Sequence, residues 1–389
     1  MKPFILFLLC FFLVSRGLKF IAILRFLHTG ESPSTVNPSL SLIQPISRGA
    51  TNLKKNLVSR FRQTKISNIH HLLVCDALDF ESINLCKKLQ TQYNDKHITL
   101  LIFPRGENEV ASKISKMNLA LQVAKGEVVG FIDDDIELYE NCLFDLVQNL
   151  FAHTDTGVVF GLPIAVSQEN IWSTINTMFV NTQAFFLYIP LTYLINPFTI
   201  TGHIYLLKRD MFDEVGGFLE MDNQFHDDNA LAVRLMHHGY TCLQTKVTYK
   251  VHNYLATMGL LNKQLKRWFM MPRKSILQNA TASQQIVTSI LSLDFFIPFL
   301  ALILAITSMS PTTITSFAFI LAIFILIDQI HLKYNLKLPF KIQDILLYPF
   351  VVCIIPLIVL MTLITPNPHV YWREQKIKLK DKGFFEVVK

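Results

Sequence analysis

Three consecutive aspartates, Asp133 to Asp135, directly follow the apolar run Val128–Ile132. A short run rich in β-branched residues and bounded by polar ones predicts a buried strand of an α/β sheet. In such sheets, ligands bind just beyond the carboxyl ends of the strands. The sequence therefore predicts that the three carboxylates lie at a binding edge, where their mutual repulsion calls for a compensating cation.

The expected cation is Mn²⁺ or Mg²⁺, held by Asp133 and Asp135. Both ions prefer oxygen ligands, and Mg²⁺ typically uses one or two carboxylates while substrate phosphates complete its coordination shell. The alternative is that the acidic residues precede the helix predicted over Leu138–Asn149, because carboxylates are favoured at helix N-termini. The triplet alone leaves both interpretations open.

Two further aspartates, Asp76 and Asp79, follow the strand predicted at His70–Cys75. A carboxylate there could accept a hydrogen bond from the N3–H group of uracil, much as acidic residues at strand ends bind ribose in dinucleotide folds. An ordinary turn with a helix N-cap explains the same residues equally well.

Lys113 and Lys116 begin the helix predicted over Ser112–Lys125, which precedes the triplet strand. Helix N-termini and lysine side chains both attract phosphate, so these residues are candidate contacts of a diphosphate. The alternative is a solvated helical face.

A glycine-rich turn, Gly216-Gly217-Phe218, precedes a loop that holds His226, Asp227 and Asp228. Because the helix predicted at Asn229–His238 follows directly, a carboxylate of this loop would stand over the first turn of a helix. Asp228 is the candidate general base, and simple N-capping by either aspartate is the alternative.

The segment from Gln264 to Trp268 reads Gln-Leu-Lys-Arg-Trp. The guanidinium of Arg267 suits a diphosphate, and Trp268 supplies an aromatic platform. Taken alone, the segment is more typical of an amphipathic surface helix.

The elements that must position these residues read as α/β over residues 38–280. Alternating strands and helices predict a doubly wound, mostly parallel sheet. The predicted strands are Ser41–Ile46, His70–Cys75, Ile98–Phe103, Val128–Asp133, Gly157–Phe160 and Ile204–Lys208, with helices at Glu81–Tyr93 and Ser112–Lys125 between them.

Membrane segments are expected on either side of this domain, because 51% of the 389 residues are hydrophobic and the mean hydropathy is +0.36. Residues 1–28 are predicted to be an N-terminal anchor whose cations Arg16 and Lys19 extend toward an interface. Within the domain, about residues 177–200 include the apolar stretch Phe185–Ile195, which is too short to span a bilayer but suits its interface. A core helix is the alternative.

Residues 284–365 contain three apolar runs, and the first two are so close that they must form a helical hairpin. The positive-inside rule places the basic loop after the second run and the basic tail, residues 366–389, on the cytoplasmic side. Three full crossings would separate the loop from the tail. Either the third run does not cross or the tail breaks the rule. The runs are Ile286–Met309, Thr313–Ile327 and Ile345–Ile364.

The order of a strand-end Asp, D-x-D, a downstream Asp and Q-x-x-R-W resembles the family 2-type inverting glycosyltransferases, in their membrane-embedded branch. The resemblance is greatest to ceramide glucosyltransferase and its bacterial lipid-glycosylating relatives. It runs over nearly the whole chain and includes Thr201-Gly202 and Gly161-Leu162-Pro163. It implies a GT-A type fold with an N-terminal anchor and a C-terminal transmembrane helical region.

The resemblance also implies roles for the candidate residues. Asp228 would be the catalytic base, and Asp133 and Asp135 would hold the metal. The nucleotide sugar would be bound by Asp76, Asp79, Lys113, Asp133, Asp134, Asp135, Gln264, Arg267 and Trp268.

The implied reaction is inverting transfer from a nucleotide sugar, a UDP-hexose such as UDP-glucose, to the hydroxyl of a ceramide-like or other membrane lipid. The implied location is the membrane, with the catalytic domain on its cytoplasmic face. A processive polysaccharide synthase, a non-catalytic lipid-binding relative and a transporter are the alternatives. No Arg-rich helix or basic–aromatic stripe predicts a nucleic-acid partner, although the net charge is +7.

Overall fold

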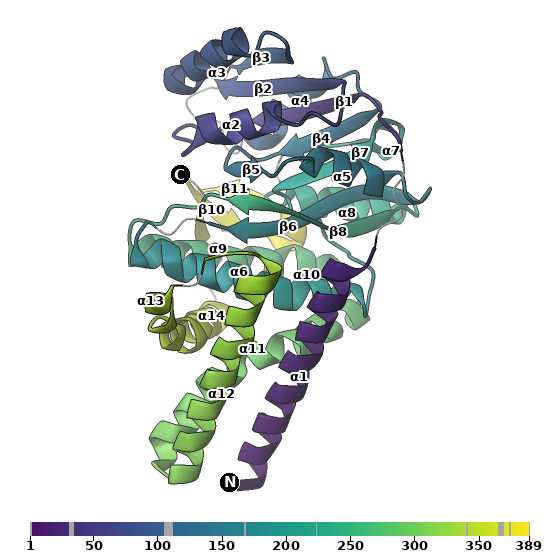
Figure 1. Ribbon diagram of the computed structural model, residues 1–389. Coiled ribbons are helices and arrows are strands. Elements are labelled where there is room, and N and C mark those ends of the chain that lie inside the picture. The colour runs from purple at the N-terminus through teal and green to yellow at the C-terminus, as the bar shows by residue number, and fades with distance from the viewer. Residues whose placement is uncertain are drawn as a thin grey trace.

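The centre of the protein is a mixed, mostly parallel sheet with the strand order β3-β2-β1-β4-β7-β6-β8-β5 (Figure 1). The computed structural model describes residues 2–30, 35–104, 112–166, 169–222, 224–339, 341–364, 369–372 and 375–388. The strands are β1 Leu40–Pro45, β2 Ile69–Asp76, β3 His97–Phe103, β4 Val128–Ile132, β5 Ile136–Leu138, β6 Thr156–Ala165, β7 Ile204–Lys208 and β8 Thr241–Val251. The six predicted strands are all present, β7 with the predicted bounds and the other five with shifted ends, and β5 and β8 were not predicted.

The predicted α/β fold class is confirmed, with one departure at β7. Strands β1 to β4 pair in parallel, and β6 pairs in parallel with β8, whereas β7 runs antiparallel to both β4 and β6. The pairing of Ile132 with Ile204 places the start of β7 beside the end of β4. The reversed strand therefore brings the residues just before it to the same edge as the aspartate triplet.

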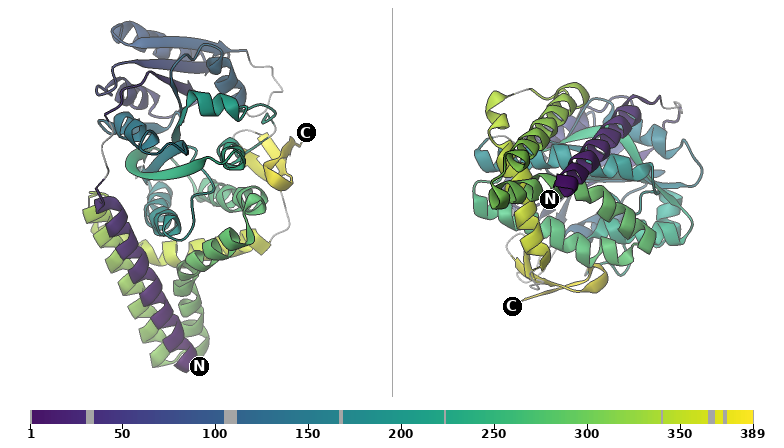
Figure 2. Two further views of the ribbon diagram at one scale, coloured as in Figure 1. Left: turned by 90° about the vertical axis from the view of Figure 1, so that its right-hand side faces the viewer. Right: turned by 90° about the horizontal axis from the view of Figure 1, so that it is seen from below.

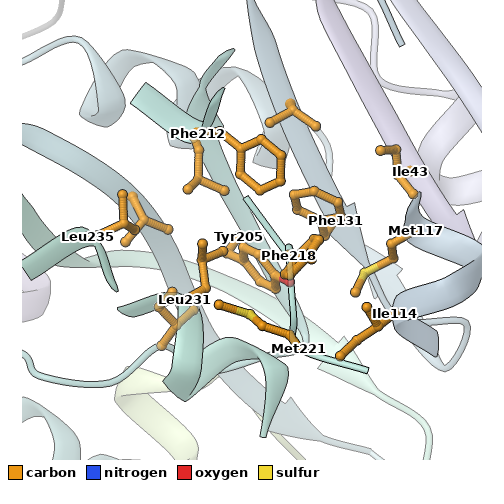
Figure 3. Packing of buried hydrophobic residues seen from close by; sticks show 14 of the residues in the cluster. Ile43, Ile114, Met117, Phe131, Tyr205, Phe212, Phe218, Met221, Leu231 and Leu235 are labelled. Atoms are coloured by element: carbon orange, nitrogen blue, oxygen red, sulfur yellow. The ribbon is translucent and has the colours of Figure 1, made fainter. Parts of the chain in front are cut away.

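Helices cover both faces of the sheet, as expected of a doubly wound fold. In β4, Val129 and Phe131 face α4, α7 and α8, while Val128 and Ile132 face α5. Figure 3 shows Phe131 among side chains of the first group. Burying each large apolar side chain contributes roughly 1.5–3 kcal/mol. The helices are α2 Leu53–Phe61, α3 Phe80–Gln92, α4 Ser112–Leu121, α5 Cys142–Leu150, α7 Arg209–Glu214 and α8 Asp227–His237.

Among the described residues, three helices are long and apolar enough to cross a membrane: Pro3–His28, Ala282–Ser308 and Pro311–Asn335. They belong to α1 (Lys2–His28), to α11 (Ala282–Ser308) and to α12 (Pro311–Ile330) with the π-helical turn η1 (His331–Asn335). The predicted hairpin is present, since α11 and α12 are joined by a short turn at Met309 and Ser310. Two helices, α6 (Ile171–Thr192) and α9 (Met258–Lys274), run between these spans and the sheet (Figures 1 and 2).

The third apolar run does not form a full span. It contains α13 (Ile342–Ile345), η2 (Phe350–Ile354) and α14 (Ile355–Ile364), and the apolar helix Phe350–Ile364 is shorter than the roughly 20 residues that a crossing needs. The chain beyond it returns to the side of the large sheet, where the C-terminus lies, while the N-terminus lies at the far end of the spans (Figure 1). Without a third full crossing, the basic loop after α12 and the basic tail lie on the same side, so the positive-inside rule no longer conflicts with the number of crossings.

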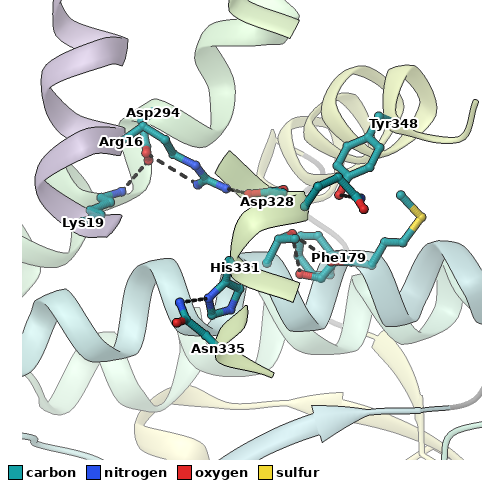
Figure 4. A network of polar contacts seen from close by, with 11 residues as sticks. Arg16, Lys19, Phe179, Asp294, Asp328, His331, Asn335 and Tyr348 are labelled. Atoms are coloured by element: carbon teal, nitrogen blue, oxygen red, sulfur yellow. Dashed lines mark hydrogen bonds and ion pairs between the residues drawn. The ribbon is translucent and has the colours of Figure 1, made fainter. Parts of the chain in front are cut away.

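The cations of the first helix do not extend toward an interface as predicted. Arg16 lies 2.5 Å from Asp328 of α12, and Lys19 lies 2.5 Å from Asp294 of α11, with all four side chains buried (Figure 4). The guanidinium also lies 3.6 Å from the ring centroid of Phe186 in α6. Ion pairing inside the bundle satisfies these charges, because the carboxylates lie within reach on neighbouring helices.

The stretch Phe185–Ile195 begins inside α6 rather than as a separate segment. Phe185 and Phe186 are buried around His331 and Arg16, so they contact protein and not lipid. The exposed apolar side chains of the stretch are Tyr188, Tyr193 and Leu194.

The ion pairs predict a sharp difference between single and double substitutions. Asp328→Leu leaves Arg16 buried without its nearest carboxylate, and breaking a buried pair in this way costs about 3–5 kcal/mol. We expect a lower unfolding temperature of the detergent-solubilised protein. The double variant Arg16→Met/Asp328→Leu removes both charges and should recover most of the loss. Equal unfolding temperatures for the single and double variants would contradict this account.

Candidate active site

The backbone of the aspartate triplet is fixed by three neighbouring segments. The Asp133 N–H donates to the carbonyl of His203 at 2.9 Å, and the His252 N–H donates to the carbonyl of Asp135 at 3.0 Å. The Asp134 carboxylate accepts from the Ser47 N–H, just after β1, at 2.6 Å. Asp134 is thus turned toward the protein, which leaves Asp133 and Asp135 as the carboxylates that can face a ligand.

A buried arginine that sequence reasoning missed supports the triplet from behind. Arg60 of α2 donates to the carbonyl of Asp133, to that of Ile136 at 3.0 Å and to Gln44 Oε1 at 2.9 Å. Burial lowers the pKa of Arg60 to about 10, against the opposing effect of the three aspartates. The side chain therefore supplies a fixed positive charge next to three negative ones.

A sequence signal for this role existed. Leu53, Leu57 and Phe61 define the buried face of α2, and Asn56 and Arg60 fall on the same face. Asn56 also contributes, since its Nδ2 donates to the carbonyl of Asp134 at 2.8 Å. Polar residues on a buried helical face must find partners, and here the partners are the carbonyls of the triplet loop.

Lys113, at the start of α4, joins the triplet to the aspartate pair of α8. Its Nζ lies 3.0 Å from Asp133 Oδ1 and 3.4 Å from Asp227 Oδ2. Burial disfavours the charge, but Asp133, Asp227 and other neighbours together raise the lysine's pKa. Residues from β4, α4 and α8 that are far apart in the sequence are therefore brought together by one permanent cation. Lys116 has a different place, because its buried Nζ donates to the carbonyl of Ile46 at 2.6 Å.

The two aspartates of α8 are in different environments. The helix begins at Asp227, two residues earlier than predicted, and its N-cap is His226, which makes no side-chain capping bond. The alternative interpretation, N-capping by Asp227 or Asp228, is therefore wrong. Asp227 pairs with Lys113, whereas Asp228 Oδ1 accepts from the Asn229 N–H at 2.8 Å.

Asp228 is packed against backbone that has no room for a side chain. A Cβ built on Gly202, in the segment before β7, would collide with the Asp228 carboxylate. Burial, and then the charge of Asp227, raise the pKa of Asp228 to about 7, while Lys113 opposes the rise. A carboxylate with this pKa can accept a proton near neutral pH and then release it.

The residues present fit a divalent cation beside the triplet. Asp135 Oδ1 is buried and has no hydrogen-bond partner. Burial, and then the charges of Asp133 and Asp134, raise the pKa of Asp135 to about 8, so an ionised Asp135 needs a positive partner. In the part of the chain that the structure describes, no cluster of three or more acidic, His or Cys side chains forms a complete metal site.

Asp76 and Asp79 lie at the carboxyl end of β2. Asp76 is buried, and its Oδ1 accepts from the Leu78 N–H at 3.2 Å. Asp79 is the N-cap of α3 and accepts from the Ser82 N–H at 3.2 Å through Oδ1. The helix-cap interpretation therefore accounts for one oxygen of Asp79, and nucleotide binding by both residues stays a prediction.

The Gln-Leu-Lys-Arg-Trp segment lies on α9, between the sheet and the membrane helices. Trp268 stacks on Phe179 of α6 with a centroid separation of 6.4 Å, which fixes the two helices together. The charge of Arg267 acts on His226, in the loop before α8. Burial, then Arg267 and then Lys113 lower the pKa of His226 to about 3. Gln264 is partly buried one turn earlier on the same helix.

Known proteins similar to this chain include two curated relatives from Caenorhabditis elegans. Ceramide glucosyltransferase 1 is 24% identical over 284 residues, which are 70% of this chain and 59% of that protein. Ceramide glucosyltransferase 3 is 23% identical over 236 residues, which are 60% of this chain and 50% of that protein. The matched part thus spans only about half to three-fifths of these relatives.

Among solved structures, the mannosyltransferase PcManGT from Pyrobaculum calidifontis, in complex with GDP-Man and Mn²⁺, has a similar fold. The TM-score is 0.55 at 15% identity, and the match covers 93% of this chain and 97% of that one. The sequence resemblance drawn from the motifs is confirmed at the level of the family. The family described as Glycosyl transferase family 21 matches residues 7–385, and this membrane protein belongs to it.

Proposed function

We propose that this protein transfers a sugar from a nucleotide sugar, a UDP-hexose such as UDP-glucose, to the hydroxyl of a ceramide-like or other membrane lipid. One observation carries the proposal. Lys113 links Asp133, after β4, to Asp227, beside Asp228, through contacts of 3.0 and 3.4 Å. The candidate metal-binding carboxylates and the candidate base therefore form one site, as a reaction between a bound donor and an acceptor requires.

The proposed chemistry is a single in-line displacement at the anomeric carbon. Asp228 takes the proton of the acceptor hydroxyl, and general-base help of this kind contributes about 10²–10⁴-fold. Lys113 and Arg267 attract the departing diphosphate, and Asp227 holds Lys113 in place. One displacement inverts the anomeric centre, so an α-linked donor gives a β-linked product.

The proposed cofactor is Mn²⁺ or Mg²⁺ on Asp133 and Asp135. When bound there, the ion would supply positive charge to the leaving diphosphate. The relative that supports this choice is PcManGT, whose structure contains Mn²⁺ and GDP-Man. The unpartnered Asp135 Oδ1 is the feature of this chain that favours the same arrangement.

The lipid acceptor is proposed to enter from the membrane side, where α6 and α9 separate the spans from the sheet (Figure 1). The catalytic side is proposed to be cytoplasmic. The basic residues Lys333, Lys337 and Lys341 follow α12 at its catalytic end, while the turn at the opposite end of α11 and α12 is uncharged. That distribution follows the positive-inside rule.

The direct test is transfer by the purified protein in detergent, with total lipid extract and a panel of UDP- and GDP-sugars. We expect a new glycolipid from one UDP-hexose, detected by mass spectrometry and absent without a nucleotide sugar. A proton NMR spectrum of the product should show the inverted anomeric configuration. Failure to form any glycolipid with the whole panel would overturn the proposal.

The metal assignment predicts that chelation stops transfer and that added Mn²⁺ or Mg²⁺ restores it. Asp135→Asn should raise the metal concentration for half-maximal rate by at least about tenfold, a scale reached even by outer-shell partners. Asp134→Asn is the matched control, because Asp134 is bound to the Ser47 N–H. It should change the metal requirement far less. Full activity in excess chelator would exclude the assignment.

The base assignment predicts different effects for two adjacent residues. Asp228→Asn keeps the size of the side chain but cannot take the proton, so transfer should fall by at least roughly 10²-fold with donor binding intact. In the unmodified protein, protonation of Asp228 removes the base, so kcat/KM should fall as pH drops through about 7. Asp228→Asn should lose this acidic limb. Asp227→Asn should retain more activity and keep the limb at a lower pH, because the charge of Asp227 raises the pKa of Asp228. Equal loss in both variants would refute the assignment.

A further inference from the structure

The basic tail of the chain folds into a small antiparallel sheet, here called the tail sheet. It contains β9 (His369–Trp372), β10 (Gln375–Leu379) and β11 (Phe385–Val387), with a 3-10 turn at Asp381–Gly383. In β10 the lysines Lys376 and Lys378 are exposed, while Ile377 and Leu379 are buried. Lys376 and Lys378 therefore form the outer face of an amphipathic strand.

The buried face of the tail sheet packs on the end of α9 and on the loop before α8. Ile377 and Leu379 share one apolar cluster with Met270 and Met271 of α9 and with Phe225 of the loop. At the end of α9, Lys274 lies 2.7 Å from Asp381. The tail sheet thus contacts α9, which carries Arg267 and Trp268, and the loop that leads to Asp227 and Asp228.

Main-chain bonds fix the loop to the tail sheet. The Phe225 N–H donates to the carbonyl of Gly383 at 3.0 Å, and Gln224 forms a β-bridge with Phe384. Gly383 has φ +87°, and a Cβ added there would lie 2.6 Å from Gln224 Oε1. The added Cβ would also lie 3.2 Å from the Cβ of Ser275. Glycine at residue 383 therefore leaves room for both side chains and adopts the positive φ without strain.

The fixed loop leads directly to the candidate base. His226 follows Phe225, and its Nδ1 lies 2.5 Å from the hydroxyl of Ser275, which donates to the carbonyl of Met271 at 2.9 Å. Because that hydroxyl is the donor to Met271, His226 donates its Nδ1–H to Ser275. His226 is also the N-cap of α8 and makes no side-chain capping bond. Its contact with Ser275 is one of those that hold the start of α8, together with the Lys113–Asp227 ion pair and the bond that Asn229 donates to Thr199.

We propose that the tail sheet is a positioning element for Asp228, acting through Gly383, Phe225 and His226. It fixes where α8 begins, and so it fixes the carboxylate two residues further on. The inference rests on the proposed function, since it assigns an effect on transfer to residues that do not touch substrate. Misplacement of a catalytic group by about 1 Å can cost on the order of 10²-fold in rate.

The test is Gly383→Ala, compared with Gly239→Ala as a matched control. The two glycines have nearly the same backbone strain, with φ of +87° and +84°, but a Cβ at residue 239 meets nothing within 4 Å. We expect Gly383→Ala to lower kcat by about 10- to 100-fold. Donor binding measured by calorimetry should stay within about twofold, because a Cβ at residue 383 would meet Gln224 and Ser275 and not Arg267 or the aspartate triplet. Gly239→Ala should keep near-normal kcat.

A rescue distinguishes positioning from general loss of stability. Gln224→Ala removes the side chain that the new Cβ would meet, so Gln224→Ala/Gly383→Ala should recover part of the kcat lost in Gly383→Ala. The acidic limb of the pH profile should shift in Gly383→Ala and return toward normal in the double variant.

Three outcomes separate the possible failures. Normal kcat and pH profile in Gly383→Ala would overturn the inference while leaving the proposed function intact. Loss that follows only the folded fraction, with the pH profile unchanged, would also overturn it, because the tail would then be merely stabilising. No transfer by the unmodified protein with any nucleotide sugar would instead defeat the proposed function.

Discussion

The site depends on the repulsion among carboxylates that are gathered at one edge of the sheet. Asp133 and Asp227 both contact Lys113, and Asp135 and Asp228 are close to them in the chain. The pKa of Asp228 is raised to about 7 and that of Asp135 to about 8. Such a cluster is unfavourable without cations. Lys113 offsets part of the charge in front of the triplet and Arg60 offsets part behind it. The negative charge that remains favours a bound cation, and the raised pKa of Asp228 suits a group that accepts a proton near neutral pH.

The reversed strand β7 gives this edge its shape. Because β7 starts where β4 ends, the carbonyl of His203 holds Asp133, and Gly202 leaves room for the Asp228 carboxylate. A parallel strand at this place would put its N-terminal residues at the opposite edge. The connection through α6 explains the reversal. The chain leaves β6, passes along α6 on the membrane side of the sheet (Figure 1), and enters β7 from the same edge, so that β7 runs antiparallel to β6. One topological feature thus joins the membrane-proximal helices to the candidate chemistry.

Much of the fold could be predicted from local pattern, and the failures have physical causes. The segments that became β1 to β4 are short, largely apolar and bounded by polar residues, so they could be recognised as strands. β8 was missed because two of its buried residues are the polar Gln244 and Thr245, so Thr241–Val251 lacks a clean apolar alternation. The start of α8 was misplaced because aspartate is a common N-cap, whereas Asp227 here is occupied by Lys113. Arg60 was missed because its place on the buried face of α2 shows that it needs partners but not which ones, and two of those partners are main-chain carbonyls 73 and 76 residues away.

The charged residues that look most like surface features in the sequence turn out to connect the parts of the molecule. Arg16 and Lys19 join the first span to α11 and α12 through buried ion pairs. Asp381 of the tail pairs with Lys274 at the end of α9. Each of these contacts joins segments more than 100 residues apart in sequence. Sequence composition cannot distinguish such a link from a solvated charge, because the two differ only in what the fold places opposite. Long-range links of this kind hold the sheet, the tail and the membrane helices in fixed positions relative to one another.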